Sequence, residues 1–356
     1  MTAPAPEPPP FVVLQDAVDA ARASLPSDAL AYVEGGAEDE YTLVENRRAF
    51  GRWHLRPRFL TGAPAADPST TFLGLPVAMP VLVAPFAGDT LLHRDGYRGV
   101  LEAAASLGTL AVVPEVTGET LEALAGAAPA AAARIFQLSL RHPHAVLVDL
   151  LRRATDAGFG AFCVTVDVPV VGVRRRELRN PGARLEIANF RSRSTGFMDD
   201  TGEREQPWTW TRLADVMATA NVPFAVKGVL TAEDARAAVD AGATAVYVSN
   251  HGGRQLDGAP ATLDQLAEIV AEVGSDAEVA IDGGVRSGGD VVKALALGAR
   301  AVLVGRPVCY GLAAAGTSGV RRVLEILRHE LVTAMTLLGR ARVSDLDRTM
   351  LQAASR

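Results

Sequence analysis

The sequence predicts an α/β fold, a (β/α)8 TIM barrel with an N-terminal helical extension. An alanine-rich stretch, a glycine and a buried apolar run recur in that order four times, and four further apolar runs raise the number of candidate strands to eight. Most intervals between these runs are long enough for a helix, and eight parallel strands with alternating helices close into a barrel. An open doubly wound sheet more often has fewer strands and an early Gly-x-Gly-x-x-Gly turn, so we favour the barrel.

The part of the chain before the barrel is expected to be helical. The helical pattern runs from Leu14 to Phe50 and is broken at Pro26 and at the Gly35-Gly36 pair. The proline-rich start has no apolar signal core, which predicts a disordered tail, and the aperiodic stretch near the middle of the chain is typical of a lid, a binding loop or disorder. The expected divisions are the tail at 1–12, the helical extension at 13–70 and the barrel at 71–345, with a lid loop at about 180–212.

Each strand is predicted from its own apolar run. In the four repeats Gly108, Gly158, Gly242 and Gly298 can each close a helix in the left-handed conformation and lead into a buried strand. In chain order the candidate strands lie in the segments Val81–Ala84, 107–113, Arg134–Leu138, 157–165, Pro223–Val226, 241–249, Glu278–Ile281 and 297–305.

The composition points to a small-molecule partner. Of the 356 residues 21% are charged and the formal net charge is −6, which gives no electrostatic case for nucleic acid or anionic lipid. No uninterrupted apolar segment approaches the roughly 20 residues that span a bilayer. Cys163 and Cys309 lie in apolar segments, where free buried thiols are commoner than a bridge or a metal site. We therefore expect a cytoplasmic protein without a metal.

Polar residues and glycines gather where the later strands end, which is where a barrel forms its active site. They are Thr165 and Asp167 after the fourth strand, Lys227 after the fifth, Ser249 and His251 after the sixth, Asp282, Gly284 and Arg286 after the seventh, and Gly305 and Arg306 after the eighth. Two glycine–arginine sets after the last strands favour a phosphate-bearing ligand. Lys227 supplies a positive charge suited to a reduced, anionic ring system.

His251 and Arg254 form the most informative pair. An imidazole changes protonation state near neutral pH, and a guanidinium three residues later suits a carboxylate. The pair indicates proton abstraction from an anionic substrate. A histidine and an arginine that satisfy each other at a turn are the simpler interpretation, which the clustering of ionisable groups at equivalent strand ends disfavours.

Several motifs in the same order identify a family resemblance between about Leu25 and Gly339. The matching segments are 32–39, Glu45-Asn-Arg47, Thr165-Val-Asp167, 226–234, Ser249–Asp257 with Pro260-Ala-Thr262, Asp282–Arg286, 293–298 and Gly305-Arg-Pro307. The sequence resembles the FMN-dependent L-2-hydroxy-acid oxidases and dehydrogenases, which include glycolate oxidase, lactate oxidase, flavocytochrome b2 and mandelate dehydrogenase. The resemblance implies a TIM barrel that binds FMN and oxidises an (S)-2-hydroxy acid to the 2-oxo acid.

The resemblance also implies roles for single residues. His251 would be the base, with Asp167 holding its imidazolium, as electrons pass to flavin N5; hydride and carbanion routes both remain open. Arg254, Tyr32 and Arg174 match residues that grip the substrate carboxylate. Positions that match the flavin and ribityl site are Ala84, Pro85, Ala87, Gln137, Thr165, Lys227 and Ser249, and those that match the ribityl and phosphate site are Asp282, Gly284, Arg286, Gly305 and Arg306. Molecular oxygen is preferred over a quinone or another acceptor, and a homotetramer is implied.

Three positions depart from the family pattern. Ser139, expected in the substrate site, stands where relatives have a tyrosine that contacts the substrate oxygen, Glu115 stands near the flavin where serine or threonine is usual, and Phe86 replaces a smaller residue. The identity of the 2-hydroxy acid is therefore left open. Ser139 and Glu115 motivate an alternative, a biosynthetic tailoring flavin oxidase for a larger or amino-bearing 2-hydroxy or 2-amino acid, with or without decarboxylation. A second alternative is a non-redox FMN isomerase or phosphate-ligand binding barrel, against which the retained His251 and Asp167 argue.

Overall fold

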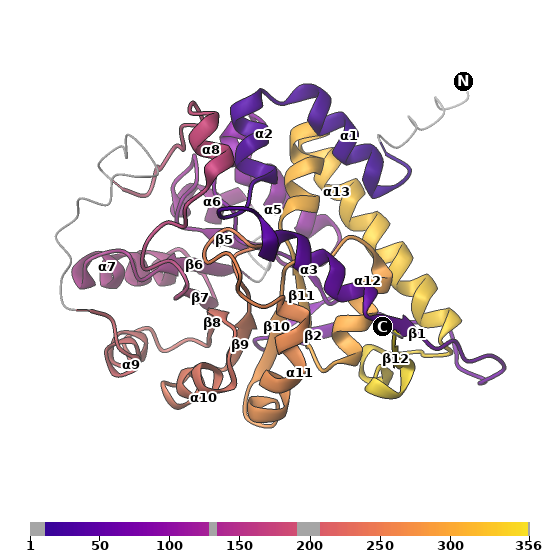
Figure 1. The fold of residues 1–356 in the computed structure, drawn as a ribbon. Coiled ribbons are helices and arrows are strands. Elements are labelled where there is room, and N and C mark those ends of the chain that lie inside the picture. The colour runs from indigo at the N-terminus through magenta and orange to yellow at the C-terminus, as the bar shows by residue number, and fades with distance from the viewer. Residues whose placement is uncertain (1–10, 128–133, 191–206, 355–356) are drawn as a thin grey trace, which may run out of the picture.

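A closed barrel of eight parallel strands forms the centre of the computed structural model, which describes residues 11–127, 134–190 and 207–354 (Figure 1). The strands are β4 (Val81–Val83), β5 (Val112–Pro114), β6 (Ile135–Ser139), β7 (Ala161–Thr165), β8 (Phe224–Val229), β9 (Ala245–Val248), β10 (Glu278–Ile281) and β11 (Ala301–Val304). They are ordered β4-β11-β10-β9-β8-β7-β6-β5. A parallel bridge between Val83 and Ala111 joins the two ends of this sheet, which confirms the predicted (β/α)8 barrel.

The helices that follow the start of the barrel include a ring on its outer side and one short helix, Arg175–Arg179, that lies at its mouth. They are α4 (Asp89–Leu92), α5 (Gly96–Ser106), α6 (Leu121–Ala127), α7 (His144–Asp156), α8 (Arg175–Arg179), α9 (Trp210–Ala218), α10 (Ala232–Asp240), α11 (Thr262–Val273), α12 (Gly288–Ala296) and α13 (Arg306–Leu337). The four repeat glycines have φ values of 65°, 89°, 95° and 105°, so each adopts the left-handed conformation that the sequence predicts. Ser287 begins α12 with a side chain that accepts a hydrogen bond from the Asp290 N–H.

The segment before the barrel forms three helices, α1 (Leu14–Ser24), α2 (Ser27–Glu34) and α3 (Tyr41–Gly51). The breaks fall at Pro26 and after Glu34, as predicted. Helix α1 packs on α13, and α2 lies near the mouth of the barrel beside α8 (Figure 1). The extension therefore contributes side chains to the end of the barrel where the carboxyl ends of the strands lie.

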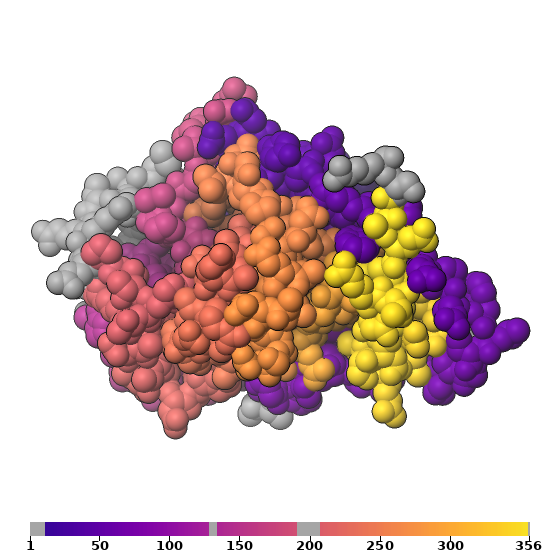
Figure 2. All heavy atoms as spheres, turned by 60° about the horizontal axis from the view of Figure 1, so that its bottom comes forward, coloured from indigo at the N-terminus to yellow at the C-terminus, as the bar shows by residue number. Residues whose placement is uncertain are grey.

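Two small antiparallel pairs were not predicted. β1 (Trp53–Leu55) pairs with β12 (Leu351–Ala353), which follows the short 3-10 helices η1 (Val343–Asp345) and η2 (Arg348–Met350). Figure 2 shows the last residues beside those of the N-terminal extension. β2 (Thr70–Phe72) pairs with β3 (Leu75–Val77), and this hairpin packs Phe72 and Val77 into the cluster of side chains that fills the barrel interior. The hairpin thus closes the end of the barrel opposite the carboxyl ends of the strands.

Some expectations fall partly outside the described residues. The predicted tail lies there up to residue 10, and so do residues 191–206 of the predicted lid loop, whereas α9 begins at Trp210 within that predicted loop. Within the described ranges, no helix is long and apolar enough to cross a membrane. The same residues contain no group of three or more His, Cys, Asp or Glu side chains placed to hold a metal ion.

Candidate active site

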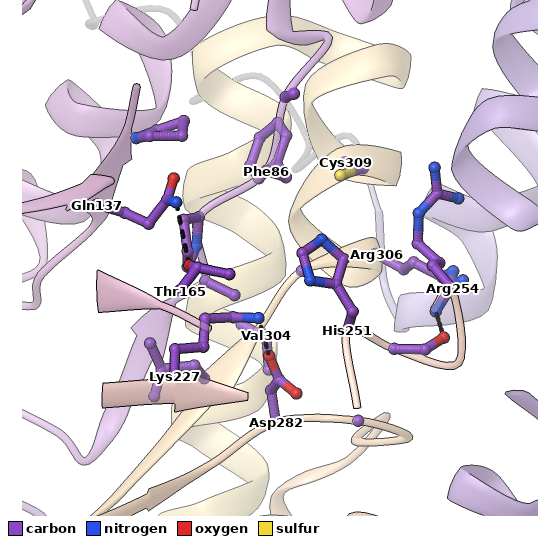
Figure 3. Close-up of a pocket in the computed structure, with 18 of the residues that line it drawn as sticks. Phe86, Gln137, Thr165, Lys227, His251, Arg254, Asp282, Val304, Arg306 and Cys309 are labelled. Atoms are coloured by element: carbon purple, nitrogen blue, oxygen red, sulfur yellow. Dashed lines mark hydrogen bonds and ion pairs between the residues drawn. The ribbon is translucent and has the colours of Figure 1, made fainter. Parts of the chain in front are cut away.

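A pocket opens at the carboxyl ends of the barrel strands and brings most of the predicted site residues together (Figure 3). Predicted residues that line it are Tyr32, Ala84, Pro85, Ala87, Gln137, Ser139, Thr165, Arg174, Lys227, His251, Arg254, Asp282, Gly284, Arg286, Gly305 and Arg306. Phe86 and Glu115, the departures noted in the sequence, also line it. Asp167 and Ser249 lie behind this lining and contact the residues in it.

His251 sits in the loop that follows β9, in the left-handed backbone region, with a φ of 59°. Its N–H donates to Ser249 Oγ at 3.1 Å, and its Nδ1 lies 3.2 Å from Asp167 Oδ1. An imidazole that donates from Nδ1 to the carboxylate keeps Nε2 as the atom that can accept a proton. Burial and the nearby Lys227 charge lower the pKa of His251 against the opposing effect of Asp167, so the neutral, basic form predominates at neutral pH.

Asp167 remains a carboxylate although it is buried. Burial raises the pKa of Asp167, but the interaction with His251 and the Lys227 charge together outweigh it, and the net pKa lies below the ordinary value. A charged Asp167 stabilises an imidazolium on His251. The two residues therefore have the arrangement of a base with its orienting carboxylate.

Lys227 is held as a buried ammonium by the residues at the ends of β9 and β10. Its Nζ donates to Ser249 Oγ at 3.0 Å and lies 4.0 Å from Asp282 Oδ2. Although burial lowers the pKa of Lys227, Asp167 and Asp282 raise it by more, so the charge persists. The Tyr247 hydroxyl donates to the same Asp282 Oδ2 at 2.8 Å, an interaction that the sequence did not reveal.

Arg254 and Arg174 form a cationic corner that shares one carboxylate. Glu177 Oε1 accepts from Arg254 Nη2 at 2.9 Å and lies 3.7 Å from Arg174 Nη1. Arg254 also donates to the Tyr32 carbonyl oxygen at 2.6 Å, and its guanidinium lies 4.8 Å from the Tyr32 ring centroid. Burial and the Arg254 charge lower the pKa of Arg174 to about 9. The two guanidiniums bring positive charge to this corner, which suits an anionic substrate.

Tyr32 contributes its ring and backbone to this corner. Its hydroxyl donates to the Ala87 carbonyl oxygen at 3.0 Å, and burial raises the pKa of Tyr32 to about 12. The phenol therefore stays protonated at physiological pH and can act as a hydrogen-bond donor.

Glu115 and Ser139 meet on the wall formed by β5 and β6. Ser139 Oγ donates to Glu115 Oε1 at 2.5 Å and the Ser139 N–H donates to Glu115 Oε2 at 3.1 Å. His142 Nε2 lies 3.2 Å from the same Oε2, and the His142 ring stacks on Phe190 with 4.5 Å between centroids. The two departures from the family pattern are thus coupled to each other.

The remaining pocket residues fit the FMN that the sequence predicts. Asp282 Oδ1 is buried without a hydrogen-bond partner among the described residues, so it is ready to accept from a ribityl hydroxyl. Arg286 lines the pocket close to the N-terminus of α13, where backbone N–H groups and the helix dipole favour a phosphate. Apolar lining on one side comes from Ala84, Pro85 and Val304.

Arg306 uses its side chain differently from the sequence expectation. Its Nε, Nη1 and Nη2 donate to the carbonyl oxygens of Val33, Gly252 and Gly35, at 2.8, 2.9 and 2.9 Å. The guanidinium thus joins α2 to the loop after β9, and burial lowers the pKa of Arg306 to about 10. Because these nitrogens already donate to carbonyl groups, a phosphate near α13 would interact with the positive charge and the backbone of Arg306 more readily than with its side-chain donors.

Sequence reasoning missed four residues that shape the site. Glu177 follows Arg174 by three positions, a spacing that places both on one side of a short helix and that was available as a signal. Gln255 accepts from Arg174 Nη2 at 3.3 Å and donates to the Asp167 carbonyl oxygen at 2.7 Å. Tyr247 and His142 carry no signal in the sequence alone, since their roles depend on which neighbouring strand each one meets.

Comparison with known proteins agrees with this geometry. A family model described as FMN-dependent dehydrogenase matches residues 21–353. L-lactate oxidase from a Nostoc species is 42% identical over 349 residues, 93% of this chain and 95% of the relative. Glycolate oxidase from Spinacia oleracea is 39% identical over 346 residues, 94% of this chain and 93% of the relative.

Solved structures with similar folds support the same family assignment. A crystal structure of mandelate oxidase is 42% identical and superposes with a TM-score of 0.90, covering 97% of this chain and 98% of that chain. A mandelate oxidase structure with benzoyl-formic acid is 41% identical, with a TM-score of 0.88 and the same coverage. The chain therefore belongs to the FMN-dependent dehydrogenase family.

Proposed function

We propose that this protein oxidises an (S)-2-hydroxy acid to the 2-oxo acid with FMN as its cofactor and molecular oxygen as the final acceptor. The observation that carries the proposal is the His251–Asp167 pair at 3.2 Å, in one pocket with the Arg174 and Arg254 guanidiniums. A base beside a carboxylate-binding corner is what removal of a proton from a 2-hydroxy acid requires.

Different side chains bind the substrate and accept its proton. The substrate carboxylate binds at the cationic corner of Arg174 and Arg254, where it competes with Glu177 for the same guanidiniums. The bound acid is then oriented so that His251 Nε2 accepts a proton from it. Asp167 stabilises the resulting imidazolium through Nδ1, and this pairing serves a hydride or a carbanion route equally well.

FMN supplies the electron acceptor when it is bound. Lys227, Gln137 and Thr165 would lie along its ring and ribityl chain, with Gln137 Nε2 donating to Thr165 Oγ1 at 3.0 Å to fix both side chains. Asp282 and Arg286 would hold the ribityl chain and the phosphate. A fixed positive charge at Lys227 favours a reduced, anionic ring, so this residue tunes the cofactor as well as binding it.

The acceptor, the assembly and the location extend the proposal. Oxygen is supported by relatives that are named as oxidases. A homotetramer and a cytoplasmic location are tested by size-exclusion chromatography with light scattering and by cell fractionation; one rice relative is named as peroxisomal.

Anaerobic mixing with a panel of 2-hydroxy acids tests the reaction. Bleaching of the FMN absorbance by at least one acid, followed by recovery and hydrogen peroxide release when oxygen is admitted, is the expected result. His251→Gln should slow bleaching by about 10²–10⁴-fold or more, because the base is lost. FMN content should stay near that of the wild type. No bleaching by any acid, with FMN bound, would overturn the proposal and favour the non-redox alternative.

A second candidate function rests on the Glu115–Ser139 contact. An acidic group in the pocket wall favours a larger or amino-bearing 2-hydroxy or 2-amino acid, as a tailoring oxidase would use. Fastest FMN reduction by glycolate or lactate would argue against this candidate.

A further inference from the structure

The wall of β5 and β6 lies across the pocket from the carboxylate corner. Gln137 and Arg254 stand on opposite sides of His251 in Figure 3, and Ser139 is two residues beyond Gln137 on β6, so both side chains point to the same side of that strand. Ser139 and Glu115 line the pocket there. A substrate anchored at Arg254, with its reacting carbon at His251, can extend its side chain toward this wall.

The hydrogen bonds in the wall have a fixed direction. The Ser139 hydroxyl uses its one proton on Glu115 Oε1, so Oγ presents only lone pairs to a ligand. The Glu115 oxygens accept from the Ser139 N–H and hydroxyl and carry the carboxylate charge. The groups that Ser139 and Glu115 present are hydrogen-bond acceptors, whereas a tyrosine at position 139 would bring a phenolic donor.

The wall is also rigid and shielded. Glu115 is 4% exposed and Ser139 is 5% exposed. On the outer side the His142 ring, which reaches Glu115 Oε2, stacks on Phe190. Asn189 Nδ2 donates to the Glu115 carbonyl oxygen at 2.8 Å, which ties the stem of the 180–190 segment to the end of β5. A carboxylate held from several sides keeps its orientation when a ligand arrives.

We propose that Glu115 and Ser139 form a side-chain subsite that selects 2-hydroxy acids whose far end carries a hydrogen-bond donor, with an ammonium group preferred over a hydroxyl. The carboxylate charge sets that order, because a charge-assisted hydrogen bond is stronger than a neutral one. The serine leaves room for the added group where a tyrosine would fill the space. This assignment rests on the proposed 2-hydroxy-acid oxidation, since it names the class of substrate for the same pocket.

The cation Arg141 sets the competing expectation. Arg141 lines the same pocket, and His142 contacts Glu115 from the outside. If Arg141 governed selection, a second carboxylate on the substrate would bind best. The geometry favours Glu115 instead, because Arg141 is exposed to solvent, where its charge is screened, whereas Glu115 is buried.

Binding of unreactive carboxylates to the FMN-loaded protein tests the subsite apart from catalysis. 4-Aminobutanoate, 4-hydroxybutanoate, pentanoate and succinate lack the reacting hydroxyl and differ only at the far end. Dissociation constants come from calorimetry and from the shift of the FMN absorbance. We expect 4-aminobutanoate to bind about tenfold or more tightly than pentanoate, with 4-hydroxybutanoate between them. Equal or tighter binding of pentanoate or succinate would overturn the subsite.

Variants distinguish the effect of losing the Glu115 carboxylate from general effects on folding. Glu115→Gln keeps the shape and should remove most of the preference for 4-aminobutanoate over pentanoate. Ser139→Ala should weaken binding of the hydroxyl and ammonium ligands but not of pentanoate. Ser139→Tyr, which fills the space, should reverse the order in favour of the smallest acids. Glu272→Gln is the matched control, because Glu272 lies on the surface of α11 and pairs with Arg236. A preference that survives both Glu115→Gln and Ser139→Ala would contradict the assignment.

Rates of FMN reduction connect the subsite to turnover. (S)-4-Amino-2-hydroxybutanoate should show a lower KM than (S)-2-hydroxypentanoate, and Glu115→Gln should reduce that difference chiefly through KM, since the proposed contact is with the far end of the substrate and not with its reacting carbon. If no 2-hydroxy acid reduces the FMN but 4-aminobutanoate still binds through Glu115, the proposed oxidation fails and the subsite stands. If 2-hydroxy acids reduce the FMN with no preference for the substrate that bears an amino group, the proposed oxidation stands and the proposed subsite fails.

Discussion

His251 combines two features that a base at this position needs. Its left-handed backbone turns the imidazole into the pocket, and Asp167 fixes the ring from behind. Thirty percent of the side chain remains exposed, and His251 is part of the pocket lining, so a substrate can reach the ring. The sequence placed both residues correctly because each follows a barrel strand that its apolar run reveals.

Replacing Asp167 with Asn should change both the rate and its dependence on pH. The Asp167 charge raises the pKa of His251, so its loss lowers that pKa further below the ordinary value of 6.5. The acid limb of kcat/KM, where His251 becomes protonated and inactive as the pH falls, should therefore move to lower pH. The maximal rate of FMN reduction should fall by about 10²-fold, because the imidazolium loses its stabilising charge. A pH profile from stopped-flow reduction checks this, and an acid limb that moves upward would contradict it.

Tyr247 is a positioning residue for the cofactor site. Tyr247→Phe removes the donor from Asp282 Oδ2 and leaves Lys227 as the nearer partner for that carboxylate. We expect Asp282 to turn toward Lys227, which weakens FMN binding and lowers the midpoint potential of bound FMN. Loss of a buried hydrogen bond should destabilise the fold by about 1–3 kcal/mol. Fluorescence titration with FMN and dye-equilibrated reduction measure the first two effects; an unchanged FMN affinity together with an unchanged potential would show that Tyr247 is only structural.

At the scale of elements, glycine positions and apolar runs carried most of the information. The repeat glycines mark four helix-to-strand junctions with the predicted backbone conformation. β1, β2, β3 and β12 were missed because, unlike the equally short β4 and β5, they are not buried apolar runs, and each depends on a partner distant in the sequence or on a tight turn. Arg306 was assigned from its motif, which reveals that an arginine is present but not which carbonyl groups its side chain meets.

Arg306→Leu should loosen the N-terminal extension from the barrel. The substitution leaves the carbonyl oxygens of Val33 and Gly252 without their side-chain donor, and Gly35 keeps only Arg254. We expect a loss of about 3 kcal/mol or more in the free energy of unfolding. Because Gly35 also accepts from Arg254, the KM for the substrate should rise as well. Denaturant unfolding of the FMN-loaded protein and steady-state kinetics test both effects, with Arg306→Lys as the intermediate case.

For the whole molecule, the sequence predicted the barrel and the end of the barrel at which most of the candidate site residues lie together. Strand order in a parallel barrel follows chain order, so knowing that a residue ends a strand is sufficient to place it at the mouth. What the sequence did not predict are side-chain pairings such as Glu177 with two arginines or Ser139 with Glu115. These depend on rotamers and on distances between neighbouring strands, which periodicity does not encode.

The join between β4 and β5 is the weakest part of the barrel wall. Among the described residues one bridge links these strands, whereas five residue pairs link β6 to β7. The segment Ala84–Ala87, which lines the FMN side of the pocket, continues directly from β4. Local opening should therefore begin at this seam, and the apoprotein should open there most readily.

Native-state hydrogen exchange can follow that opening. The Val83 N–H, which donates to the Leu110 carbonyl oxygen across the seam, should exchange sooner than the amides within β7 once FMN is removed, and FMN should slow it. Equal protection at both places in the apoprotein would contradict this. Local opening between β4 and β5 would then be the route by which FMN enters and leaves the barrel. The junction that completes the ring of strands would set both the rate at which a newly made chain binds its flavin and the rate at which it loses it.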